Sequence, residues 1–221
     1  MHSPEKKLNF IKSKVKEIII TKQLKTKPNI IAVTKTFSTS KFISLLKSGH
    51  IHFGENKMQE AETKWVQIKK DFGSIKLHMI GKLQSNKAKK AVQLFDYIHS
   101  LDNIKLATKI SQYEKELNKK VKLFIQVNVA NESQKSGIQL NNLENFYNFC
   151  TKNLSLDIIG LMCLPPVNSD PSKYFQILKD KSIELNLLDL SMGMSTDYDK
   201  AILFGSTYLR LGTAIFGERN T

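Results

Sequence analysis

Short apolar runs recur along this chain, and each is separated from the next by a longer segment of mixed polarity. The runs are rich in β-branched and aromatic residues and are bounded by polar or turn-forming residues, which is typical of buried strands. We therefore predict eight strands, at residues 30–34, 51–54, 76–80, 97–100, 121–129, 158–163, 187–192 and 207–211.

The segments between these runs carry apolar residues at helical spacing. Before the first run, Ser3 is placed to cap a helix that has Pro4 at its first position, where a missing N–H costs nothing. The apolar face of this helix comprises Leu8, Ile11, Val15 and Ile18. Similar stripes predict helices around residues 42–46, 61–68, 88–95, 106–110, 143–150, 175–178 and 201–202.

Eight strands alternating with helices in a chain of 221 residues are the pattern of a (β/α)8 barrel, or TIM barrel, preceded by an N-terminal helix. An open, doubly wound sheet is the alternative. No stretch rich in Pro, Gly or Ser interrupts the chain, so we expect one domain over residues 1–221. Barrels of this kind carry their sites at the carboxyl ends of the strands. The polar residues that follow the apolar runs are therefore predicted to meet at one rim.

The first apolar run ends in a lysine, in the stretch IIAVTK at residues 30–35. A strand-end lysine often does nothing more than extend its ammonium group to water. Lys35 alone does not distinguish that interpretation from a functional one.

The formal net charge is +14, from 34 Lys and Arg against 20 Asp and Glu, and a basic surface attracts nucleic acids and anionic metabolites. The excess is mostly lysine scattered along the chain, which indicates solvated helix faces rather than one nucleic-acid footprint. The best place for such a contact is the basic segment that includes Lys87, Lys89 and Lys90.

The chain has two cysteines, Cys150 and Cys163, both among apolar neighbours, so a disulfide framework is not expected. No pair of Cys or His residues has a spacing typical of a metal site. The first 20 residues contain charges throughout, unlike a secretory signal, and no apolar stretch approaches the length of a membrane span. These features predict a cytoplasmic protein without membrane association.

Seven motifs in order give the chain a family resemblance. They are AVTK, HFGEN followed by QE, LHMIGKLQSNK, SQKSGI, GLMCLPP, LSMGMS and RLGTAIFGER, spanning about residues 30–219. Together they resemble the pyridoxal phosphate homeostasis family, whose members are single barrels similar to the first domain of alanine racemases.

The resemblance implies that Lys35 binds pyridoxal 5′-phosphate covalently, as an internal aldimine. This chemistry needs an amine that is neutral part of the time, and partial burial favours the neutral form. The phosphate is implied to lie against Ser191, Ser195, Gly212 and Thr213, where hydroxyl and backbone N–H groups can satisfy its oxygens.

By the same resemblance, Arg210 faces the pyridine nitrogen of the cofactor. A guanidinium group can donate a hydrogen bond but cannot act as the carboxylate that keeps this nitrogen protonated, so the ring would be a poor electron sink. Asn56 and His78 are expected at the same rim as neighbours of the cofactor, and Met162 is expected to pack against its ring. For His78, a satisfied core position is the alternative.

We therefore expect a non-catalytic protein of vitamin B6 homeostasis that holds pyridoxal phosphate on Lys35 and buffers it or delivers it to apo-enzymes. The alternatives are an amino-acid racemase and a basic RNA-binding module. Alanine racemases bring a tyrosine base from a second, β-rich domain, and the sequence ends at Thr221 without one, which favours the carrier. Nucleic acid is not the expected partner, and the resemblance suggests a monomer or weak homodimer.

Overall fold

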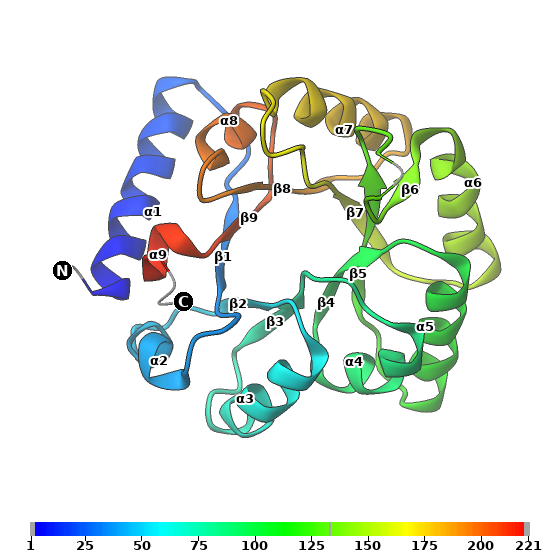
Figure 1. Cartoon of the computed structure of the whole chain (residues 1–221), viewed down its shortest axis with the longest axis horizontal. Coiled ribbons are helices and arrows are strands. Elements are labelled where there is room, and N and C mark those ends of the chain that lie inside the picture. The colour runs from blue at the N-terminus through cyan, green and yellow to red at the C-terminus, as the bar shows by residue number, and fades with distance from the viewer. Residues whose placement is uncertain (1–2, 133, 219–221) are drawn as a thin grey trace.

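The computed structural model describes residues 3–132 and 134–218, which form a closed barrel of parallel strands surrounded by helices (Figure 1). The barrel strands are β1 (Asn29–Val33), β2 (His52–Glu55), β3 (Lys76–Met79), β4 (Tyr97–Leu101), β5 (Lys122–Asn128), β7 (Ile158–Met162), β8 (Asp189–Met194) and β9 (Tyr208–Leu211). They are hydrogen-bonded in the order β4-β3-β2-β1-β9-β8-β7-β5, and the pairing of β4 with β5 closes the ring. The predicted eight-stranded barrel is confirmed, and the doubly wound alternative is wrong.

One further strand, β6 (Ile138–Gln139), lies outside the ring and pairs with the end of β5 at Val127 and Asn128. The pattern of the sequence does not predict this strand. The strand has only two residues, Ile138 and Gln139. Two residues are too few to form an apolar run or an alternation from which a strand could be predicted.

Helices follow the strands and cover the outside of the barrel (Figure 1). The α-helices are α1 (Pro4–Thr21), α2 (Thr39–Lys47), α3 (Met58–Asp71), α4 (Ala88–Leu94), α5 (Ile104–Glu116), α6 (Leu143–Asn148), α7 (Ser172–Glu184), α8 (Tyr198–Leu203) and α9 (Thr213–Phe216). Short helical turns of other types are formed by Ser85–Lys87, Leu140–Asn142 and Phe149–Asn153.

Helix α1 begins as predicted, because the Ser3 side chain accepts a hydrogen bond from the Lys6 backbone N–H at 3.3 Å and Pro4 occupies the first turn. It contacts α2, α8 and α9. Since α9 has only four residues, α1 covers the barrel where a longer helix after β9 would otherwise lie (Figure 1).

Strand β8 begins two residues later than predicted, at Asp189 instead of residue 187. Leu187 is buried, but Leu188 is 89% exposed and belongs to the turn that precedes the strand. Two adjacent leucines suggested a strand start, whereas only one of them packs on the core. The last residue of the final motif, Arg219, lies outside the described residues.

The core has two parts. A large apolar layer lies between the strands and the helices, and a smaller cluster fills the barrel with Ile31, Val33, Tyr97, Phe124, Met162 and Tyr208. The barrel is therefore a packed core with no open pore through it. No helix within the described residues has both the length and the apolar character that a membrane crossing requires.

Several histidines belong to this core. His78 and His99 are fully buried, His50 is 9% exposed, and His52 is partly buried. Burial lowers the pKa of His50 and of His52 from 6.5 to about 4, with the positive charge of Lys12 adding to the effect at His50 and that of Lys76 at His52. Burial likewise lowers the pKa of His78 and His99 well below 6.5.

We predict that replacing Gly160 by alanine destabilises the barrel. A Cβ atom at residue 160 would overlap the carbonyl oxygen of Asp189 on the neighbouring strand and lie 2.6 Å from its carbonyl carbon. Because backbone cannot rotate away, β7 and β8 must separate, and the free energy of unfolding should fall by about 2 kcal/mol or more. Gly73→Ala is the matched control, since a Cβ there meets nothing within 4 Å. Equal urea midpoints for the two variants would contradict this account.

We also predict that acid destabilises the folded state through its buried histidines. Their folded pKa values lie below 6.5, so between 6.5 and about 4 the unfolded chain binds protons that the folded chain does not. The stabilisation present above pH 6.5 is therefore lost as the pH falls toward 4.

The variant His50→Phe tests this, because it removes one such proton. From pH 7 to pH 4.5, the free energy of unfolding of the wild type should drop by up to about 3 kcal/mol more than that of the variant. Urea denaturation across this range measures the difference, and a difference that does not change with pH would show that His50 does not titrate as described.

Candidate functional site

Lys35 lies just beyond the carboxyl end of β1. The ladder continues one residue past the strand, since the Thr34 N–H donates to the Gly54 carbonyl at 2.9 Å. Ile31 and Val33 face the barrel interior, and side chains of a strand alternate between its two faces. The next position on the inner face is therefore Lys35, which is partly buried at the rim.

The peptide units on both sides of Lys35 are held by charged groups of α3. Lys64 Nζ donates to the Thr34 carbonyl oxygen at 2.8 Å, and Glu60 Oε1 accepts from the Thr36 N–H. Thr36 has a φ of 66°, which is unusual for a β-branched residue and costs of order 1–3 kcal/mol. The ion pair between Lys64 and Glu60 thus fixes a strained turn next to the lysine.

Glu55, the last residue of β2, anchors this arrangement from below. Its Oε1 accepts from Thr34 Oγ1 at 2.7 Å, from Trp65 Nε1 at 3.0 Å and from Lys64 Nζ at 3.2 Å. Burial raises the pKa of Glu55, and the bonds from Trp65 and Thr34 and the charge of Lys64 oppose that rise. Its Oε2 is buried without a hydrogen-bond partner among the described residues.

No role for Glu55, Glu60 or Lys64 was predicted from the sequence. The signal present was the i,i+4 spacing of Glu60 and Lys64 on a helix that directly follows GEN. The same spacing is common on solvated helix faces, and only the fold shows that Lys64 reaches a neighbouring strand end.

Arg210 is buried in the barrel at 4% exposure. Its Nη1 donates to the carbonyl oxygen of Ser191 at 2.6 Å and to Ser191 Oγ at 2.7 Å, and its Nη2 donates to the Cys163 carbonyl at 2.9 Å. Burial lowers the pKa of Arg210, and the nearby carboxylate of Asp197 opposes this. No ion pair among the described residues includes Arg210.

Strands β1 and β9 lie side by side, and Lys35 is four residues beyond the residue of β1 that pairs with Arg210. Ile31 pairs with Arg210 and Ala32 with Leu211, so the two strands end side by side. Three of the five N–H donors of Arg210 are used by the bonds to Ser191 and Cys163. Within the described residues, its other two donors have no hydrogen-bond partner.

Ser195 and Gly212 meet at the ends of β8 and β9. Ser195 Oγ accepts from the Gly212 N–H at 3.2 Å and from the Ala214 N–H at 3.1 Å. Both lone pairs of the hydroxyl are thereby used, which leaves its proton to be donated. Thr213 is exposed at the first position of α9. The structure does not bring Ser191 to this group, since it lies beneath Arg210 in the interior.

Of the three other predicted site residues, one lies at the rim and two are buried in the barrel. Asn56 follows β2 at the rim, and its Oδ1 is buried without a hydrogen-bond partner among the described residues. Met162 is fully buried in the cluster inside the barrel. His78 is also fully buried, between His52 and His99, which is the core position given as its alternative.

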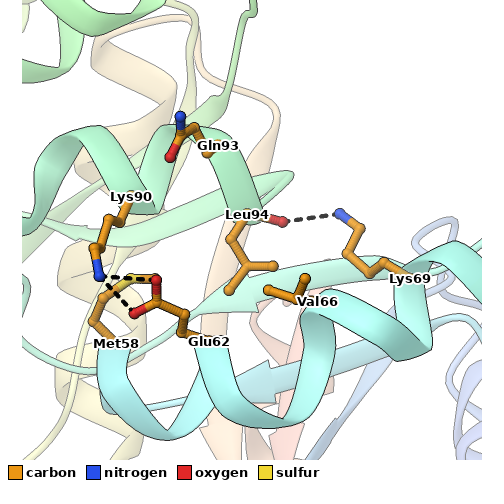
Figure 2. A pocket seen from close by; sticks show the side chains of 7 residues that line it. All are labelled: Met58, Glu62, Val66, Lys69, Lys90, Gln93 and Leu94. Carbon is orange, nitrogen blue, oxygen red and sulfur yellow. Dashed lines mark hydrogen bonds and ion pairs between the residues drawn. The ribbon is translucent and has the colours of Figure 1, made fainter.

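A pocket on the outside of the barrel lies between α3 and α4 (Figure 2). Lys90 and Glu62 form an ion pair across it at 2.8 Å, and Lys69 donates to the Leu94 carbonyl at 2.9 Å. The predicted site residues do not line it. Lys89 is also paired, with Glu116 at 3.4 Å, so this basic segment has acidic partners in the neighbouring helices.

Sequence comparison gives consistent matches over almost the whole chain. The family model described as alanine racemase, N-terminal domain, matches residues 12–220. A pyridoxal phosphate homeostasis protein of Synechocystis sp. is 37% identical over 226 residues, covering 95% of this chain and 99% of that protein. The protein of the same name from Escherichia coli is 32% identical over 201 residues, covering 86% of each.

This chain belongs to the pyridoxal phosphate homeostasis protein family. The resemblance found in the seven motifs is thus confirmed.

Solved structures agree with this family. PipY of Synechococcus elongatus, in a structure with pyridoxal phosphate bound, has a TM-score of 0.80 and 32% identity, covering 92% of this chain and 100% of that chain. An alanine racemase of Clostridium difficile has a TM-score of 0.70 at 12% identity and covers 95% of this chain but 57% of that one. The second likeness shows the fold alone, and the predicted resemblance to the alanine racemase barrel is confirmed at that level.

We predict that Lys64 stabilises this family member far more than an ordinary surface lysine does. In Lys64→Met, the buried Glu55 loses its cationic partner, and the free energy of unfolding should fall by about 3 kcal/mol. Lys90→Met is the control, because the side chains of Lys90 and Glu62 are 58% and 42% exposed, and such pairs contribute less than about 1 kcal/mol. Urea denaturation at pH 7.5 compares them. If Lys64→Met and Lys90→Met lost similar amounts of unfolding free energy, the contacts of Lys64 would not stabilise the turn beside Lys35.

Proposed function

We propose that this protein binds pyridoxal 5′-phosphate at the rim of its barrel, covalently through Lys35, and keeps the reactive aldehyde bound for intracellular vitamin B6 homeostasis. The names of its relatives and the cofactor in PipY support this. The observation that carries the proposal is the adjacency of β1 and β9: Lys35 follows the end of β1, and Arg210 lies on β9 beside Ile31, beneath the rim.

The residues at the rim fit this cofactor. Pyridoxal phosphate supplies an electrophilic aldehyde, a dianionic phosphate and a ring nitrogen. Lys35 would supply the amine that, in its unprotonated form, condenses with the aldehyde with release of one water. The turn around Lys35 is held in place before binding by Lys64 and Glu60, so little ordering of the backbone opposes the reaction.

The phosphate end is proposed to meet Ser195, Gly212 and Thr213. The Ser195 hydroxyl has its proton available and is fixed by two backbone N–H groups. Glycine at residue 212 lets a ligand approach the backbone closely. Buried Arg210 adds positive charge beneath the rim, which favours an anionic ligand. Asn56, after β2, has an unsatisfied amide oxygen, which can accept from a donor group of a ligand but not from a phosphate dianion.

Arg210 also supports holding the cofactor over catalysis on it. Its guanidinium can donate to the ring nitrogen but does not accept a proton from it. A ring without a proton on this nitrogen stabilises a carbanion weakly, which fits holding the cofactor, or racemase-like chemistry at most. Met162 packs in the cluster below the rim. Ser191 bonds to Arg210 in the interior instead of meeting the phosphate. His78 is linked to Ser191 through His99. We further propose a cytoplasmic monomer or weak homodimer that passes its cofactor to apo-enzymes.

The first test is the absorption spectrum of the protein loaded with pyridoxal phosphate. Wild type should show the band of a lysine-linked cofactor, and borohydride should fix the cofactor to the peptide that contains Lys35. Lys35→Ala should lose the band, whereas Lys82→Ala, at an exposed lysine in the loop after β3, should retain it. If Lys35→Ala takes up as much pyridoxal phosphate as the wild type does, Lys35 does not bind the cofactor and the proposal is wrong.

A racemase assay tests the enzymatic alternative. With alanine and saturating pyridoxal phosphate, we expect no turnover above that of free cofactor. Turnover that disappears in Lys35→Ala would make the protein an enzyme and would overturn the carrier assignment.

A further inference from the structure

Three histidines from adjacent strands form a hydrogen-bonded column inside the barrel. His52 Nδ1 lies 2.9 Å from His78 Nε2, and His78 Nδ1 lies 2.9 Å from His99 Nε2. The column ends on β8, where His99 Nδ1 lies 2.8 Å from Ser191 Oγ. Because Ser191 Oγ also accepts from Arg210 at 2.7 Å, the column leads from the first residue of β2 to the buried guanidinium group.

Aromatic rings hold the imidazoles in place. Tyr97 stacks on His78 with ring centroids 4.3 Å apart and an interplanar angle of 15°. Phe124 stacks on His99 at 4.2 Å and 17°. Both histidines are fully buried. Each ring therefore has one packed orientation, and its nitrogens have only their neighbours in the column as partners.

The proton positions follow from the donor at the end of the column. Arginine only donates, so Ser191 Oγ is the acceptor of the Arg210 bond, and its own proton needs an acceptor. His99 Nδ1 provides one if the His99 proton is on Nε2. That proton then points to His78 Nδ1, which places the His78 proton on Nε2, directed at His52 Nδ1.

The opposite arrangement of the protons leaves the Ser191 hydroxyl without an acceptor. If each proton were on Nδ1, Ser191 Oγ would accept from both His99 and Arg210. Its hydroxyl proton would then have no acceptor among the partners described for it. A buried polar group without a partner is costly, so the first direction is favoured.

We propose that His52, His78 and His99 are positioning residues, locked as Nε2–H tautomers, that fix the Ser191 hydroxyl and through it the Arg210 guanidinium. The role for the cofactor rests on the proposed function. The column itself does not, because it is complete in the protein alone.

The column is neutral at physiological pH. Burial lowers the pKa of His99, and so does the positive charge of Arg210; at His78 burial acts first, followed by the neighbouring His99 and His52. A protonated ring would add a second positive charge beside Arg210 and would also remove an acceptor from the column. The neutral state is what lets each ring both accept and donate.

The first measurement is the tautomeric state of the histidines in the cofactor-free protein. Long-range ¹H–¹⁵N spectra at pH 7.5 should show neutral rings with the proton on Nε2 for His52, His78 and His99. The guanidinium N–H signals of Arg210 should be sharp. An Nδ1–H form at His78 or His99, or a mixture of forms, would overturn the proposal.

Substitutions at His99 test the positioning role. In His99→Phe, Ser191 loses its acceptor, so Arg210 signals should broaden and the dissociation constant for pyridoxal phosphate should rise about tenfold. His99→Asn keeps an oxygen in the place of Nδ1, and we expect its affinity to stay within about threefold of wild type. His50→Phe is the control, because His50 is also buried but lies outside the column.

The outcomes separate the two proposals. Wild-type affinity in His99→Phe, or an equal loss in His50→Phe, would overturn the positioning role. If wild type shows the predicted tautomers and sharp Arg210 signals but takes up no pyridoxal phosphate, the proposed function fails and the column stands as the support of Arg210.

Discussion

The burial of one guanidinium group, that of Arg210, sets the composition of the barrel interior. A charge that is only 4% exposed must have its hydrogen bonds satisfied by the protein, since water cannot do so. Two strand carbonyls and the Ser191 hydroxyl fill that role. The hydroxyl then needs an acceptor of its own, which brings His99 and the other histidines into what would otherwise be an apolar core. One charge thus accounts for polar residues on several strands.

The rim above is organised by a second buried group, the Glu55 carboxylate. Arg210 keeps its charge by bonding to backbone, whereas Glu55 is balanced by Lys64 from the adjacent helix. Lys64 also binds the carbonyl next to Lys35, so the same ammonium group compensates the carboxylate and fixes the turn. The rigid backbone beside Lys35 is therefore a consequence of how the charge at the end of β2 is neutralised.

The sequence predicted the architecture well because the barrel depends on patterns that are local. Eight apolar runs and the stripes between them were sufficient for the eight barrel strands and for the helices from α1 to α8, though not for β6 or α9, and motif order was sufficient for the family. It could not predict contacts across the ring. Ser191 was grouped with the phosphate residues because it shares a motif with Ser195, yet Ser191 accepts from Arg210 in the interior, whereas Ser195 accepts from the backbone N–H groups of Gly212 and Ala214. His52 and His99 had no local signal, since a column forms only when β2, β3 and β4 are side by side.

The polar column is not the most stable way to fill a barrel. Apolar side chains of similar volume would avoid the desolvation of Arg210 and of the imidazoles, and replacing buried polar networks in this way is often neutral or stabilising. What an apolar core cannot do is hold a guanidinium group at a fixed place beneath the rim. The aromatic stacking of Tyr97 and Phe124 on the histidines limits the loss, because those rings still bury apolar faces. The interior therefore combines packing with orientation: the faces of the rings stabilise the fold, and their edges determine where the charge lies.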